Sequence, residues 1–148
     1  MHLDLHTLLP KAVAWAEQQS SEILCTGAPL TNTEASLAVR MGVARPQHVR
    51  IQVVAEFPRP EDPELFAFAE GAGLFSPTMH GLTLGHGIFI RKGYRANRLV
   101  SHECRHVFQY EQHGSIEAFL RVYLEQVGRV GYWNAPLELD AYANETDA

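Results

Sequence analysis

The stretch NRLVSHECRHVFQYEQHG, residues 97–114, contains His102, Glu103 and His106 in the spacing H-E-x-x-H. It supplies apolar residues for packing, and its first and last residues, asparagine and glycine, are typical of the two ends of a helix. Residues four apart on a helix lie one turn apart on the same face, so both imidazoles can reach one metal ion. The stretch therefore predicts a helix that carries a metal site.

Glu103 has the position that a catalytic base needs in such a site. It is rotated about 100° from His102 around the helix axis, so its carboxylate lies beside an ion and can hydrogen-bond a water held there. Zinc lowers the pKa of bound water to about 7, and a neighbouring carboxylate can take the proton as the water attacks a carbonyl. Cys104 points away from both histidines, and we interpret it as a small buried apolar residue.

A catalytic zinc needs a third protein ligand and an open fourth position. One known pattern has glycine at position 109 and histidine at position 112, but this chain has glutamine at both. The other common solution is a glutamate on a following antiparallel helix, which APLELDA, residues 135–141, offers as Glu138. We predict Glu138 as the third ligand. Asp140 is the alternative ligand, and its other role would be to orient a histidine ring.

The rest of the chain predicts further helices and a small sheet. Caps and apolar periodicity indicate helices over about residues 4–22, 32–41, 63–70, 115–131 and 134–145. HVRIQVVAEF, residues 48–57, predicts a strand, and GLTLGHGIFIRKGY, residues 81–94, predicts a tight hairpin or one bent strand. We predict one α+β domain over residues 1–148, with an N-terminal part (1–80) and a metal-site part (81–148), in which helices pack on a small antiparallel sheet and H-E-x-x-H lies on a central helix.

Composition excludes several classes of partner. The 148 residues carry a net charge of −5, which gives no basic surface for nucleic acid or an anionic membrane. No stretch approaches the roughly 18 apolar residues of a membrane span, and the N-terminus lacks the basic residues of a secretory signal. Cys25 and Cys104 form no C-x-x-C pair, although the sequence is compatible with one disulfide bond between them. We expect a cytoplasmic protein without nucleic-acid or membrane partners; the oligomeric state is not indicated.

His102-Glu103-x-x-His106 with the later Glu138-x-x-Ala141 resembles the gluzincin group of H-E-x-x-H zinc metallopeptidases, most closely its small bacterial members. The likeness covers about residues 81–145. It implies a minimal zincin-like fold, a Zn²⁺ held by both histidines and Glu138, a water activated by Glu103, and a peptide or protein substrate. It also implies that the strand TLGHGIFI, residues 83–90, binds an extended peptide along its edge, with glycines that permit close approach.

The resemblance is incomplete around the third ligand. Thermolysin-like members carry an acidic residue four positions after the ligand glutamate, where this chain has Tyr142, so their arrangement there is not carried over. An oxyanion stabiliser should be a His, Tyr or Arg side chain, and the candidates are His86, Tyr94, His113, Tyr132 and Tyr142. The sequence thus predicts a zinc metallopeptidase. The alternatives are a zinc-binding structural or partner-binding protein of the same fold without activity, and a partner-binding domain without metal.

Overall fold

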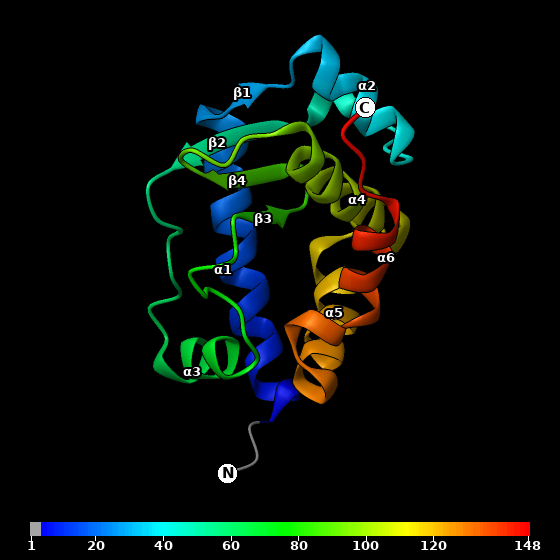
Figure 1. The fold of residues 1–148 in the computed structure, drawn as a ribbon. Coiled ribbons are helices and arrows are strands. Elements are labelled where there is room, and N and C mark those ends of the chain that lie inside the picture. The colour runs from blue at the N-terminus through cyan, green and yellow to red at the C-terminus, as the bar shows by residue number, and fades with distance from the viewer. Residues whose placement is uncertain (1–3) are drawn as a thin grey trace.

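The structure is a computed structural model that describes residues 4–148, and these form six α-helices around a four-stranded mixed sheet (Figure 1). The α+β class is as predicted. The helices are α1 (Leu5–Thr26), α2 (Asn32–Arg40), α3 (Pro63–Gly71), α4 (Asn97–His113), α5 (Ile116–Val130) and α6 (Pro136–Asn144), with 3-10 turns η1 (Pro46–His48) and η2 (Tyr132–Asn134). The strands are β1 (Ala28–Pro29), β2 (Arg50–Val54), β3 (Gly81–Leu84) and β4 (Gly87–Arg91).

The sheet order is β1-β2-β4-β3, and its two central strands run parallel. The prediction of a fully antiparallel sheet is therefore wrong. The chain leaves β2, crosses through α3 and β3, and returns as β4 in the same direction, which is the long connection that a parallel pair requires. The other two pairs are antiparallel, and Gly85 with His86 forms the two-residue turn of the predicted hairpin β3–β4.

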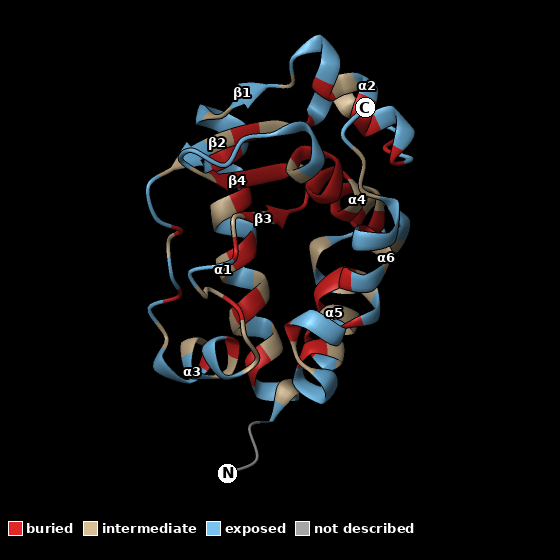
Figure 2. Cartoon of the chain, in the orientation of Figure 1, coloured by how far each residue is buried: buried red, intermediate tan, exposed pale blue. Residues whose placement is uncertain are grey.

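Each face of the sheet contributes to its own apolar core. Ile51, Ile88 and Ile90 lie in one cluster with buried residues of α2 and α4. Phe89 and Leu84 lie in the other, with residues of α1, α3 and α5. In Figure 2 the buried colour is concentrated on β4 and on α4, which lies between the sheet and α6. The predicted metal helix is thus central in the fold.

Side-chain caps begin several helices where the sequence predicts them. Thr31 forms a capping box with Glu34 at the start of α2, Asp62 caps α3, and Ser115 caps α5. The predicted cap Asn97 is wrong, because the cap position of α4 is Ala96 and the Asn97 amide donates to the Asp147 carbonyl instead. The predicted start of α6 at Asn134 is also two residues early, since Pro136 is its first residue.

The first helix presents a face of small residues to the interior. Pro10 lies within α1, and the buried positions Ala12, Ala16 and Ser20 follow one another at intervals of one turn. No helix in residues 4–148 is both long and apolar enough to cross a membrane. Cys25 is exposed and Cys104 is buried, and both are free thiols; burial raises the pKa of Cys104 to about 12.

Candidate metal centre

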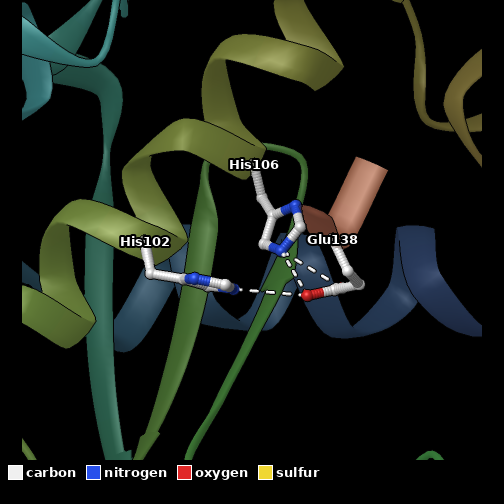
Figure 3. Close-up of side chains that lie close together, drawn as sticks. All are labelled: His102, His106 and Glu138. Carbon is white, nitrogen blue, oxygen red and sulfur yellow. Dashed lines mark hydrogen bonds and ion pairs between the residues drawn. The ribbon is translucent and has the colours of Figure 1, made fainter. Parts of the chain in front are cut away.

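Three buried side chains from two helices converge on one point. His102 and His106 lie on α4, and Glu138 reaches them from the first turn of α6 (Figure 3). The Nε2 atoms of His102 and His106 lie 3.2 Å and 3.3 Å from Glu138 Oε1. The exposed fractions of the three residues are 4%, 6% and 3%. The structure therefore brings together the three residues that the sequence selects as ligands.

The donor set is compatible with a tetrahedral ion. Zinc binds imidazole nitrogen and carboxylate oxygen at about 2.0–2.2 Å, so two ligand atoms at a tetrahedral angle are about 3.3–3.6 Å apart. The two distances from Glu138 Oε1 to the Nε2 atoms, 3.2 Å and 3.3 Å, are near that spacing, and one ligand atom from each of the three residues lies within 4.8 Å of the others. The same contacts also describe a buried ion pair between protonated histidine and carboxylate.

The hydrogen bond that Nδ1 of each histidine ring makes fixes which ring atom faces Glu138. His102 Nδ1 lies 3.0 Å from Glu145 Oε2, and His106 Nδ1 lies 2.7 Å from Gln109 Oε1. Carboxylate and amide oxygens only accept hydrogen bonds, so both Nδ1 atoms carry a proton. Both Nε2 atoms therefore turn toward a carboxylate, an arrangement that needs a cation between them, either a proton on a ring or a metal ion.

The ionisation of the cluster follows from burial and from close contacts. Burial lowers the pKa of His106, but the Glu138 carboxylate outweighs it and raises that pKa to about 9. Burial raises the pKa of Glu138, but the two histidines outweigh it and hold that pKa well below its usual range. A metal ion at His106 Nε2 would therefore have to displace a proton.

Asp140 makes no hydrogen bond to either histidine and bonds other side chains instead. Its carboxylate accepts hydrogen bonds from Arg105 Nε at 2.8 Å and from Gln109 Nε2 at 2.9 Å. Gln109 in turn holds His106 Nδ1. The hydrogen bonds of Asp140 thus reach a histidine ring only by way of Gln109, and Glu138 is the carboxylate that the fold directs to both rings.

Glu103 lies beside the cluster and is held by β3. Its side chain is only 4% exposed, and its Oε1 accepts a hydrogen bond of 2.8 Å from Thr83 Oγ1. A Cβ at Gly81 would lie 2.7 Å from Glu103 Oε2, so only glycine leaves room for this carboxylate. Burial raises the pKa of Glu103, and the charges of His102 and His106 offset this only in part.

Of the five candidates for an oxyanion stabiliser, Tyr132 and Tyr142 lie near the cluster. The Tyr142 ring centroid is 4.6 Å from that of His102, and Tyr132 lines the cavity next to Glu138. The other three have different neighbours: His86 pairs with Glu111, Tyr94 stacks on His80, and His113 bonds the Gln109 carbonyl. The hydroxyls of Tyr132 and Tyr142 are mutual neighbours, and burial raises the pKa of both, that of Tyr142 to about 12.

The predicted peptide-binding strand, residues 83–90, is divided by the hairpin turn. Its second half belongs to β4, which pairs with β2 on one side and β3 on the other and so has no edge to offer. Gly85 has φ +69° in the turn, and Gly87 makes room for Ile23 of α1. These glycines therefore serve the turn and helix packing, and β3 is the edge strand beside the site.

Several supporting residues have no clear signal in the sequence. Tyr123 of α5 donates from its hydroxyl to Glu138 Oε2 at 2.8 Å, and burial raises its pKa well above the ordinary value. Thr83, Gly81 and Glu145 also act from outside the motif. Only Gln109, three residues after His106, has a helical spacing that could have pointed to it.

Comparison with protein-family models, with curated proteins and with solved structures found no match for this chain. The gluzincin resemblance therefore stays a prediction.

Proposed function

We propose that this chain is a zinc-dependent hydrolase that cleaves a peptide bond. One observation carries the proposal: the Glu103 carboxylate lies in the same cavity as His106 and Glu138. A structural zinc site has no use for a fourth ionisable group held beside an open space. Hydrolysis needs that group, because a base must take a proton from the attacking water.

In this proposal His102, His106 and Glu138 hold the ion through Nε2, Nε2 and a carboxylate oxygen. The ion would supply a lowered pKa for water and polarisation of the substrate carbonyl. Glu145 and Gln109 keep the two rings turned toward the ion, and Tyr123 holds the second oxygen of Glu138. Such supporting contacts usually change metal affinity by about 10–100-fold.

Glu103 moves the proton. Thr83 occupies Oε1, which leaves Oε2 as the atom that takes a proton from water. As the carbon–nitrogen bond of the substrate breaks, the same oxygen passes this proton to the leaving amine. Tyr132, which lines the cavity next to Glu138, is the hydroxyl best placed to donate to the developing oxyanion.

The second candidate is a protein in which the same cluster only stabilises the fold. Deep burial of His102, His106 and Glu138 favours it, as does the ion pair that these residues form among themselves. In that case the ion, or a proton, ties α4 to α6 and nothing is cleaved.

Glu103→Gln separates the two candidates, because glutamine keeps the shape of the side chain and cannot accept the proton. We expect purified protein to hold one equivalent of zinc by mass spectrometry in both wild type and variant. Turnover of a mixed peptide pool should fall by about 10²–10⁴-fold in the variant. Glu117→Gln, an exposed glutamate on α5, is the control and should retain full turnover. Zinc bound with no cleavage by wild type would instead support the structural candidate.

A further inference from the structure

A cavity extends from the candidate metal centre into the interior. Glu103, His106 and Glu138 line one end of it, and it continues between α1, α3 and α5. Its far walls come from the N-terminal half of the chain, through residues of α1 and α3 and the segment 74–84. The N-terminal half therefore shapes the space next to the reacting groups.

The polar atoms of the cavity are gathered at the end near the metal centre. Tyr110 donates its hydroxyl to the Thr83 carbonyl at 3.1 Å, and Tyr123 donates to Glu138. Beyond these, Tyr110, Phe119 and Tyr123 stack into an aromatic wall, with centroids 3.8 Å and 5.3 Å apart. A ligand group that enters past this wall meets almost no hydrogen-bond partner, so a polar group is disfavoured there.

The depth of the cavity depends on small side chains. Ala12 and Ala16 of α1 and Ala69 of α3 line it, and each is at least 94% buried. Facing them, Phe75 takes a backbone φ of +64°, which residues with a Cβ rarely adopt, and its ring lies edge-on against Trp15. Strained backbone of this kind is often found where it shapes a binding site.

The outermost strand of the sheet, β3, forms one wall of the cavity. Because β3 and β4 are joined by a two-residue turn, Leu84 and Leu82 pair through their main chains with β4, and the main chains of Gly81 and Thr83 face the other way. The bond from Tyr110 to the Thr83 carbonyl agrees with this direction. This bond occupies the outward carbonyl of Thr83, so β3 serves as a cavity wall beside Glu103.

We propose that the cavity receives one bulky apolar side chain of a peptide substrate, such as leucine or phenylalanine, next to the bond that is cleaved. Ala12, Ala16 and Ala69 set the size of the group that fits. This inference depends on the proposed function for its peptide, but the recognition of an apolar side chain can be measured without any turnover.

The direct test is binding to the zinc-loaded Glu103→Gln protein, which cannot turn over. The probes are the N-acetyl amides of leucine, phenylalanine, alanine and glutamine, titrated by NMR. We expect the leucine and phenylalanine amides to bind at least about tenfold more tightly than the other two. Equal binding of all four, or a preference for glutamine, overturns the inference.

Filling the cavity provides the second test. Ala16→Leu should weaken binding of the phenylalanine amide by about tenfold or more, because the new side chain takes its space. Ala14→Leu makes the same change on the exposed side of α1 and should leave binding unchanged. If circular dichroism shows that Ala16→Leu is unfolded, Ala69→Leu is used in its place, because it fills the cavity from α3. Undiminished binding in a folded filled variant overturns the inference.

Other outcomes separate this inference from the proposed function. Cleavage of peptides by wild type with no apolar preference beside the cleaved bond contradicts the inference and leaves the function standing. Probe binding without cleavage of any peptide contradicts the function and leaves the apolar site. Tighter binding of decanoate than of the amides, lost in the Ala16→Leu variant, would contradict the inference. It would show that the cavity takes an acyl chain and not a peptide side chain.

Discussion

Glu138 and Asp140 lie two residues apart on α6, and their carboxylates meet different groups. Glu138 faces both histidine rings, whereas Asp140 pairs with Arg105. We expect Glu138→Gln to weaken zinc binding by at least about 100-fold, because a ligand is lost, and Asp140→Asn to weaken it by about tenfold or less. Competition with a chelating dye measures both affinities. Equal losses in the two variants would contradict the assignment of Glu138.

Gly81 makes room for the Glu103 carboxylate, and this gives a test of Glu103 that leaves its chemistry intact. Gly81→Ala would place a Cβ 2.7 Å from Oε2 and displace the carboxylate. We expect kcat/KM on a cleaved peptide to fall by about 10²-fold with zinc content unchanged, since small displacements of a catalytic group have effects of this size. Gly71→Ala is the control, because a Cβ there meets no neighbour. Equal activity in the two variants would show that Glu103 tolerates displacement.

Among the elements, α2 is tied to the start of α4 by one buried carboxylate. Glu34 accepts two hydrogen bonds from Arg95 at 2.7 Å and 2.9 Å and one from the Thr31 amide. Burial alone would raise the pKa of Glu34, but these contacts outweigh it, so the pKa lies below its ordinary value of 4.5. A depressed pKa contributes stability above pH 4.5 that is lost as the pH falls through the folded-state value.

Glu34→Gln should therefore lower the free energy of unfolding by about 1–3 kcal/mol at pH 7. The difference from wild type should shrink as the pH falls below 4.5 and vanish below the folded-state pKa, because the carboxyl is protonated first in the unfolded chain and then in the folded protein. Urea denaturation at pH 7 and at lower pH measures both values. Glu17→Gln, at an exposed position of α1, should show no difference at either pH. A difference that grows with acidity would refute the pairing.

Helix positions follow largely from local sequence, and the sheet does not. Thr31, Asp62 and Ser115 cap helices within a few residues of themselves, so short-range patterns suffice to find them. Asn97 fails as a cap because its amide meets the C-terminal segment at Asp147, a contact that no local pattern contains. The parallel pairing of β2 with β4 likewise depends on where the chain crosses over.

At the scale of the whole molecule, an ion bound between α4 and α6 should stabilise the fold. Free zinc at 100 times its dissociation constant adds about 2.7 kcal/mol to the free energy of unfolding, provided that the unfolded chain does not bind it. For a chain of this size that corresponds to a rise in Tm of about 5–10 °C. The double variant His102→Ala with His106→Ala should show no rise by calorimetry. An equal rise in that variant would place the zinc elsewhere.

The sequence by itself determined the position of the helix that carries both histidines. The interval from His102 to His106 is one helical turn, and Gly114 at the end of the helix and the apolar residues around the motif are local features that a linear pattern contains. Tertiary structure decided between Glu138, which the sequence favoured, and its alternative Asp140, because α6 directs Glu138 to the histidines and Asp140 to Arg105. It also decided that Gly81 and Thr83 hold Glu103, and that alanines of α1 and α3 open a cavity beside it. These depend on contacts between distant segments, which only packing of the elements creates.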